Sequence, residues 1–179
     1  MIFRALFLAG LVLIATPARA QTGGPTDRVD AAFNAAIAAF ERARPALGAT
    51  AFGVDVESYG DALTLGRFHS AHWGGQVALS LEQQSGNGGS CGRFAAYVRL
   101  PPRDGVVSLV ICPQFSAEGT DPLRRLTILH EMVHVVAGPD ECRAMAFAAR
   151  VEHFATGSHT PVDRYWQANG CEGSGFRLP

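Results

Sequence analysis

The chain contains no lysine, and its 15 basic residues are all arginine. They are opposed by 16 acidic residues, so the formal net charge is −1, and charged residues make up only 17% of the sequence. A protein without excess positive charge has no general electrostatic attraction for nucleic acid or for an anionic membrane surface. We therefore expect neither of them as a partner.

The sequence also lacks long low-complexity tracts, apart from a stretch rich in glycine, serine and asparagine at 83–92. Hydrophobic residues account for 47% of its 179 residues, which is typical of a compact globular protein. This length is enough for one domain with a substantial core and leaves little room for a second.

No apolar run in the sequence reaches the roughly 20 residues that a membrane-spanning helix needs. The run Ala5–Ala15 follows Arg4 and leads to Ala18-Arg19-Ala20, the small-residue pattern that signal peptidases cleave. Residues 1–20 are therefore predicted to be a secretory signal peptide, with an N-terminal membrane anchor as the alternative. The mature protein, residues 21–179, is expected to be secreted or periplasmic and to have no membrane attachment after cleavage.

The sequence has four cysteines but no CxxC pair, a spacing typical of zinc and redox sites, so zinc ligation by cysteine is disfavoured. In an oxidising compartment an even set of cysteines can form two disulfides. The sequence leaves all three connectivities open. We favour Cys91–Cys112 and Cys142–Cys171, because each pair joins neighbouring segments of the chain.

Hydrophobic spacing predicts a helix near the start of the mature chain. Apolar residues recur at every third or fourth position from Val29 to Phe40. Thr26 or Asp27 is the expected N-cap, and Pro45 with Gly48 is expected to end the helix.

Strands are predicted in the middle of the chain. Short alternating pieces at 52–56, 63–65 and 77–81, separated by glycines, indicate two or three of them. The segments 94–100 and 106–112 then predict a β-hairpin, since Pro101-Pro102-Arg103-Asp104-Gly105 between them is a turn sequence.

A second helix is predicted from Asp121 as N-cap and Pro122 as first residue, and it contains His130-Glu131-Met132-Val133-His134. Two histidines four apart lie on one helix face, so both imidazoles can reach one Zn²⁺ at about 2.0–2.1 Å. Glu131 is adjacent and can take a proton from a water on the metal. Burying these three groups in an apolar helix would cost several kcal/mol unless something binds them.

This segment resembles the zincin metallopeptidases, whose HExxH signature is matched in full by residues 130–134. The resemblance implies a zincin-like α+β domain over residues 21–179, with a small twisted β-sheet, an active-site helix and a second helix packed behind it. It also implies that His130 and His134 are zinc ligands and that Glu131 is the general base. The likeness covers only the active-site helix and the helix that follows.

A catalytic zinc site needs a third protein ligand. The run Glu141-Cys142-Arg143-Ala144 is similar to the ExxA pattern of the gluzincins, which implies Glu141 as that ligand. The sequence departs from the gluzincin pattern at Met145, where many gluzincins have an aspartate that orients a ligand histidine. The gap between His134 and Glu141 is also shorter than is usual in gluzincins.

Asp140 is the competing third ligand. It stands six residues after His134, the spacing at which metzincin-like enzymes place their third ligand. With a carboxylate at this position, the segment is similar to snapalysin and, more loosely, to the deuterolysin-type aspzincins. The metzincin pattern has glycine three residues after the second histidine, where this chain has Ala137. Asp140 also has an ordinary role as N-cap of the next helix.

Other polar residues give weaker signals. His69 and His72 lie three apart in a predicted loop or strand, a spacing too common to indicate a metal site. In many zincins a histidine or tyrosine donates a hydrogen bond to the oxyanion formed at the scissile carbonyl. His159 and Tyr165 are the candidates for that role in this chain.

The sequence thus predicts an exported zinc metallopeptidase whose partner is a peptide or protein substrate. Zinc held by His130, His134 and Glu141 would lower the pKa of its water, and Glu131 would take the proton and pass it to the leaving amine. Two alternatives stay open. One is a non-catalytic exported protein that uses the zincin fold for binding or structure, and the other is a zinc amidase acting on a non-peptide amide.

Overall fold

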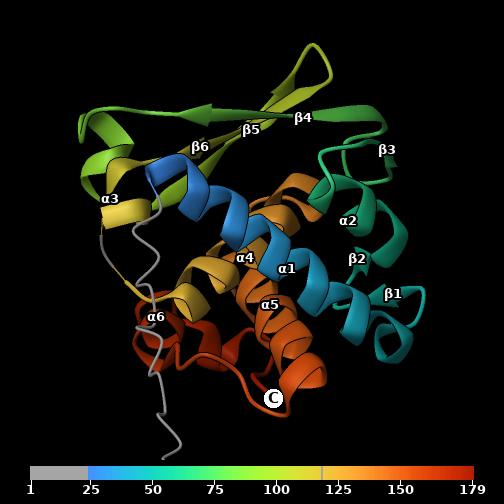
Figure 1. Ribbon diagram of the computed structural model, residues 1–179. Coiled ribbons are helices and arrows are strands. Elements are labelled where there is room, and N and C mark those ends of the chain that lie inside the picture. The colour runs from blue at the N-terminus through green and yellow to red at the C-terminus, as the bar shows by residue number, and fades with distance from the viewer. Residues whose placement is uncertain (1–23, 118) are drawn as a thin grey trace, which may run out of the picture.

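The computed structural model describes residues 24–117 and 119–179 (Figure 1). The predicted signal peptide, residues 1–20, lies outside the described residues. The helices are α1 (Pro25–Leu47), α2 (Val56–Leu63), α3 (Pro113–Ala117), α4 (Asp121–Ala137), α5 (Glu141–Thr156) and α6 (Asp163–Ala168). The strands are β1 (Thr50–Ala51), β2 (Val54–Asp55), β3 (Arg67–Ser70), β4 (Gly75–Gln83), β5 (Ala96–Arg103) and β6 (Val106–Ile111). Short 3-10 turns lie at Gly89–Gly92 and Cys171–Gly173.

The main sheet has four strands in the order β3-β4-β6-β5. β5 and β6 form the predicted antiparallel hairpin, although β5 continues through both prolines to Arg103, so that only Asp104-Gly105 makes the turn. β4 and β6 run parallel, with Leu81 opposite Leu109. This order leaves β5 at one edge of the sheet, which becomes important at the candidate site.

Helices α1, α4 and α5 pack together beneath the sheet (Figure 1). Half of the buried residues of α1 are alanines, and Phe33 and Phe40 lie between them. Small alanine side chains let neighbouring helices approach closely, and the aromatic rings fill the remaining space. α1 therefore forms a close support for the two helices that carry the predicted metal ligands.

Tyr59 of α2 connects these helices at the centre of the core. Its ring centroid lies 5.0 Å from that of Phe40 and 4.6 Å from that of Phe147. Its hydroxyl donates a hydrogen bond of 2.8 Å to the carbonyl of Leu129 in α4. A buried phenol needs such a partner. The bond fixes the backbone of α4 one residue before His130.

The N-caps of the first two predicted helices were wrong by one to three residues. Asp121 is the first residue of α4, and the Thr120 side chain is the cap, accepting from the N–H of Leu123. Threonine and aspartate are both favourable caps, so residue type alone does not choose between them. α1 begins at Pro25 with Gly24 as N-cap, which places Thr26 and Asp27 inside the helix. Proline suits this first position because its fixed φ is already helical.

The strand predicted at 63–65 was also wrong, because residues 56–63 form α2. Asp55 caps this helix by accepting from the N–H of Ser58 at 2.7 Å. Val56, Tyr59 and Leu63 then follow at helical spacing on one buried face. In so short a segment, several of the apolar residues fit both the alternation of a strand and the spacing of a helix, so the pattern does not distinguish the two.

Both favoured disulfides are present, Cys91–Cys112 and Cys142–Cys171. The first joins the loop after β4 to the end of β6, and the second joins the first turn of α5 to the C-terminal segment. Disulfides of this kind are typical of proteins from an oxidising compartment.

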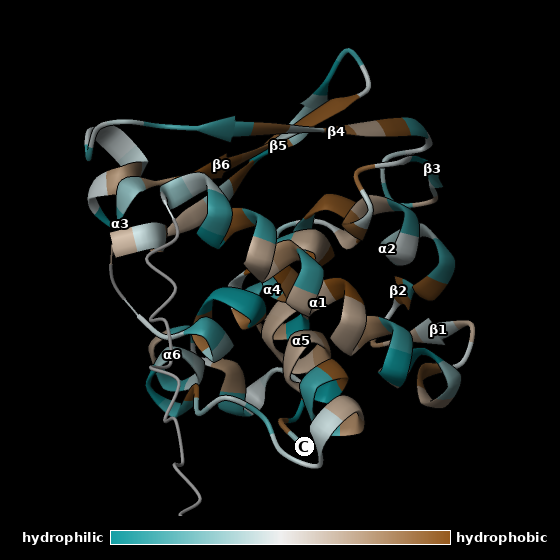
Figure 2. Cartoon of the chain, viewed as in Figure 1, coloured by the Kyte–Doolittle hydropathy of each residue, from teal (hydrophilic) through white to brown (hydrophobic). Residues whose placement is uncertain are grey.

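The described residues form one mixed α+β domain, which confirms the predicted fold class at this level. Figure 2 shows hydrophobic residues along β6 and hydrophilic residues at the β5–β6 turn, as expected for a strand in the core and a turn in solvent. Within residues 24–117 and 119–179, none of the helices combines the length and the apolar character needed to span a membrane.

Candidate metal centre

The second half of α4 carries both histidines of the sequence motif into the core. Nearly every residue from Leu126 to Ala137 is buried, and His130 and His134 are each only 5% exposed. Their rings lie edge to face with centroids 4.7 Å apart, and their Nε2 atoms are separated by 3.0 Å. The helix therefore brings the two imidazoles together, as their spacing predicts.

Helix α5 brings Glu141 to the same place. Its carboxylate Oε2 lies 3.0 Å from Nε2 of His130 and 3.3 Å from Nε2 of His134. These three side chains, which we call the ligand cluster, could hold a metal ion. Asp140, the competing residue, is not part of this cluster, and its carboxylate caps α5 by accepting from the N–H of Arg143 at 2.9 Å.

His134 is held in one orientation by the backbone. Its Nδ1 lies 2.9 Å from the carbonyl oxygen of Gly138. Since a carbonyl can only accept, Nδ1 carries the proton, and in the neutral ring Nε2 presents its lone pair to the cluster. Gly138 in turn ends α4 and donates its own N–H to the carbonyl of His134 at 3.1 Å.

The last four backbone carbonyls of α4 all accept hydrogen bonds from outside the helix. A helix end leaves four carbonyls without partners inside the helix. Here each of them accepts a hydrogen bond from a different group. The pairs are Gly138 N–H to His134, Trp73 Nε1 to Val135, Ser70 Oγ to Val136 and Arg143 Nη1 to Ala137. The β3–β4 turn and α5 thus hold the turn of α4 that contains His134.

His130 is held differently. Its Nδ1 is buried and has no hydrogen-bond partner among the described residues. Its Nε2 faces Glu141 and His134. The contacts that orient this ring through its nitrogens therefore come from the ligand cluster itself and from Tyr165.

The electrostatics of the ligand cluster favour positive charge at its centre. Burial alone would raise the pKa of Glu141, but hydrogen bonds from His130, His134 and Tyr165 outweigh it and hold that pKa well below its usual range. Burial lowers the pKa of His130, which favours its neutral form. Burial also opposes charge on His134, yet its hydrogen bond with Glu141 and the nearby charge of Glu131 raise its pKa. A proton or a metal cation would each be stabilised there.

Glu131 borders the ligand cluster and is only 8% exposed. Burial and the negative charge of Glu141 raise the pKa of Glu131 to about 8, although His134 and a backbone hydrogen bond from Val98 lower it in part. A cation bound in the cluster would favour the ionised carboxylate. Val98 belongs to β5, the edge strand, which packs against the motif helix α4.

Tyr165 of α6 also reaches the ligand cluster. Its hydroxyl donates a hydrogen bond to Oε2 of Glu141 and lies 3.4 Å from Nε2 of His130. Burial and the hydrogen bond to Glu141 raise the pKa of Tyr165, so the phenol stays protonated and able to donate. Of the two predicted oxyanion donors, the structure brings Tyr165 to the cluster, whereas His159 lies in the loop after α5 and is not part of it.

Two adjoining hollows border the cluster. A cavity of about 650 Å³ is lined largely by apolar residues, among them Leu123, Leu126, Met145 and Val162. A smaller hollow of about 310 Å³ lies between the cluster and β5 and includes Val98 and Leu100. Phe94, His130, Glu131 and Tyr165 line both. A molecule that extends through both hollows would therefore pass directly over Glu131 and the cluster.

The remaining histidines do not join the ligand cluster. His69 is exposed on β3, and His72 packs on Gly138, where a Cβ built on the glycine would meet His72 Nε2 at 2.3 Å. Sequence reasoning missed this support of Gly138, although the glycine after the helix was a visible stop signal.

Comparison of the chain with protein-family models, with curated proteins and with solved structures found no match. The geometry and chemistry of the ligand cluster therefore carry the functional proposal.

Proposed function

We propose that this protein is an exported, zinc-dependent metallopeptidase of the zincin type, with the gluzincin arrangement of Glu141 on the helix behind the active-site helix. The observation that carries the proposal is the convergence of His130 Nε2, His134 Nε2 and the Glu141 carboxylate, with Glu131 beside them. Two histidines and a glutamate are a known ligand set of catalytic zinc. The disulfides and the predicted signal peptide support export.

The spacing of the ligand atoms suits zinc. A tetrahedral zinc with bonds of about 2.0–2.2 Å separates its ligand atoms by roughly 3.3 Å. The three separations here are 3.0, 3.0 and 3.3 Å. Imidazole nitrogens also favour zinc over magnesium and calcium, which prefer oxygen ligands. Three protein ligands leave one position for water or substrate, as catalytic sites require.

When bound, zinc would supply a Lewis acid that polarises a carbonyl and lowers the pKa of water toward about 7. Glu131 then takes the proton of the attacking water and transfers it to the leaving amine. Glu131 lines the same hollow as Val98, so its carboxylate lies beside β5, where a scissile bond would lie. The single O–H of Tyr165, which donates to Glu141 in the structure, would turn to donate to the oxygen that becomes negatively charged during attack.

An extended peptide is the substrate shape that this site favours. β5 is an edge strand, so it offers backbone groups that can pair with an added strand. Glu131 lines both hollows, so such a strand could continue from one hollow into the other past the site. The apolar walls of the larger cavity, which include Leu126 and Met145, suit an apolar side chain of the substrate.

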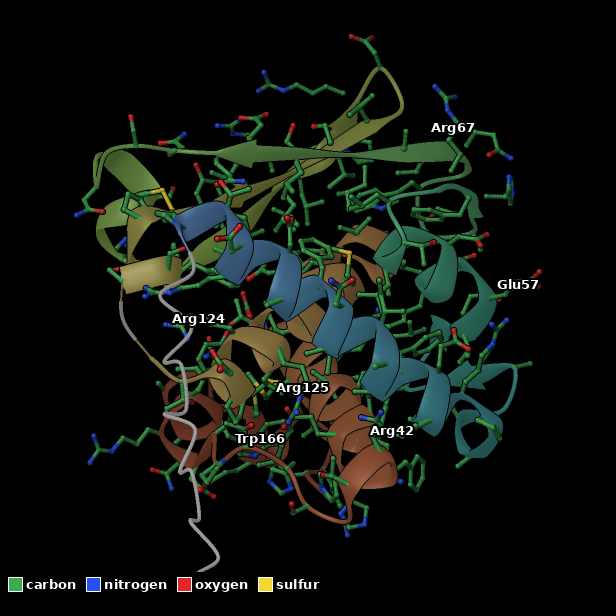
Figure 3. All side chains as sticks on the ribbon, viewed as in Figure 1. Arg42, Glu57, Arg67, Arg124, Arg125 and Trp166 are labelled. Atoms are coloured by element: carbon green, nitrogen blue, oxygen red, sulfur yellow. A yellow bond between two sulfur atoms is a disulfide. The ribbon has the colours of Figure 1, made fainter. Side chains whose placement is uncertain are left out.

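The proposal is tested by metal analysis of the purified mature protein, paired with digestion of a peptide library. Glu131→Gln should keep about one zinc per chain and the native fold, yet lose at least about 10²-fold in hydrolysis, because an amide does not accept the proton. The control is Glu57→Gln, since Glu57 is exposed at the outer edge of α2 (Figure 3). Undiminished hydrolysis by Glu131→Gln would contradict the mechanism. Zinc binding without cleavage of any peptide would favour the non-catalytic or amidase alternative.

A further inference from the structure

A second group of charged residues lies outside the ligand cluster and centres on Glu152 of α5. The side chain of Glu152 is 0% exposed, and a buried carboxylate is costly unless it is paired and hydrogen-bonded. Its Oε1 accepts from Nε and Nη2 of Arg125 at 2.9 and 2.6 Å. Its Oε2 accepts from the backbone N–H of Thr160 at 2.7 Å. Both oxygens of the carboxylate are therefore used.

These bonds join three separate parts of the chain. Arg125 lies on α4, five residues before His130, and Figure 3 shows it within the body of the molecule, whereas Glu57 and Arg67 point outward at its edge. Glu152 lies on α5, and Thr160 belongs to the loop that follows α5. A salt bridge between α4 and α5 needs only one carboxylate oxygen. The other oxygen is committed to the loop.

The segment that starts at Thr160 forms one wall of the large cavity. Residues 161–165 all line that cavity, and Tyr165 at the end of this stretch donates to Glu141. Further along the chain, Cys171 is bonded to Cys142, the neighbour of Glu141. The wall segment, residues 160–171, is thus attached at one end by Glu152 and at the other by a disulfide, with Tyr165 between the two attachments.

We infer that Glu152 is a positioning residue, which fixes the wall segment through the N–H of Thr160 and so holds the Tyr165 hydroxyl against Glu141 and His130. Its role in substrate turnover rests on the proposed function, but the placement of the wall segment does not. Glu152 touches none of the ligand atoms, so its effect passes through the backbone from Thr160 to Tyr165.

Hydrogen exchange of the purified protein tests the placement. In Glu152→Gln the single acceptor oxygen can serve Arg125 or Thr160 but not both, and Arg125 presents two donors to it. The Thr160 N–H should therefore lose its bond, and α6 its anchor. The amides of Trp166 in α6 and of Asn169, its C-cap, should exchange roughly tenfold faster while those of α4 and α5 stay protected. Thr160→Pro removes the N–H, together with the Thr160 side chain and its freedom in φ, and keeps the Arg125–Glu152 pair. It should give the same result and serves if Glu152→Gln fails to fold. The control Glu82→Gln breaks the exposed pair with Arg99 on the sheet and should change nothing in α6.

Kinetics test the route through Tyr165. Glu152→Gln should lower kcat/KM for a cleaved peptide roughly tenfold, and should have little further effect when Tyr165 is already replaced by phenylalanine. Additive losses, equal acceleration of exchange in α4, α5 and α6, or unchanged exchange in α6 would each overturn the inference. A wild-type protein that binds no zinc and cleaves no peptide would overturn the proposed function instead, and the exchange measurement would still decide the role of Glu152.

Discussion

The two histidines of the ligand cluster lie on the same face of α4, yet their second nitrogens have opposite surroundings. Nδ1 of His134 donates to Gly138 in a helix end whose carbonyls all have partners. Nδ1 of His130 is buried without a partner among the described residues. Met145, which stands where the gluzincin resemblance leads one to expect an orienting aspartate, offers no carboxylate to it.

This difference indicates that the two proposed ligands would be oriented for a metal by different means. His134 is preorganised by the backbone, whatever occupies the cluster. His130 depends on what its Nε2 faces, namely Glu141, His134 and Tyr165, and would depend on a cation when one is bound. The fold thus supplies one fixed ligand and completes the site with side chains from α5 and α6.

Removal of either histidine should have the largest effect. His130→Ala and His134→Ala should each weaken zinc binding by more than about 100-fold. Loss of a residue that only orients a metal ligand weakens binding by up to about 100-fold, and loss of a ligand itself should cost more. In the absence of metal, the two variants should differ in their free energy of unfolding. His134→Ala should lose about 1 kcal/mol of unfolding free energy with its hydrogen bond to Gly138, a loss that His130→Ala avoids because its Nδ1 has no bond to lose. Zinc competition and denaturant unfolding measure both, and normal zinc content in the double variant would refute the assignment.

Gly138→Ala should disturb the fixed ligand alone. Gly138 has φ of +87° and ψ of −172°, a region open essentially only to glycine, and an added Cβ would meet His72 Nε2 at 2.3 Å. We expect a loss of about 1–3 kcal/mol in unfolding free energy and roughly tenfold weaker zinc binding, because the carbonyl that holds His134 shifts.

Gly157→Ala is the matched control. Gly157 also ends a helix with positive φ, +81°, but no described atom lies within 4 Å of its would-be Cβ. Alanine there should cost about 1 kcal/mol in stability and leave zinc affinity unchanged. Equal zinc affinities in the two glycine variants would show that the Gly138 carbonyl does not orient His134.

Asp140→Ala should have the smallest effect of the set. The Asp140 carboxylate caps α5 through Arg143 N–H, and loss of an N-cap costs about 1 kcal/mol. Thermal unfolding of the metal-free protein should show this decrease. Loss of bound zinc would instead mean that Asp140 coordinates the metal.

Local sequence patterns predicted the parts of the site that lie on single helices. The spacing of His130 and His134, the Asp140 cap and the position of Glu141 on the next helix all depend on residues close in sequence. The pairing of the cysteines could also be predicted from the sequence, because each disulfide joins neighbouring segments of the chain.

The remaining features depend on contacts between distant segments. No local period indicates that β4 pairs parallel to β6, or that Trp73 donates to Val135 from 62 residues away. Glu152 gave no signal either, because a glutamate in a helix is usually exposed and its partners lie on other elements. Helix α2 was missed since its eight residues are too few to separate the two hydrophobic periods.

Zinc titration of the metal-free protein, carried out in parallel on Glu141→Ala and Asp140→Ala, tests the ligand cluster most directly. Wild type should bind one zinc per chain, Glu141→Ala should bind it at least about tenfold more weakly, and Asp140→Ala should match wild type. Weak binding by Asp140→Ala with wild-type affinity in Glu141→Ala would contradict the account and make Asp140 the third ligand.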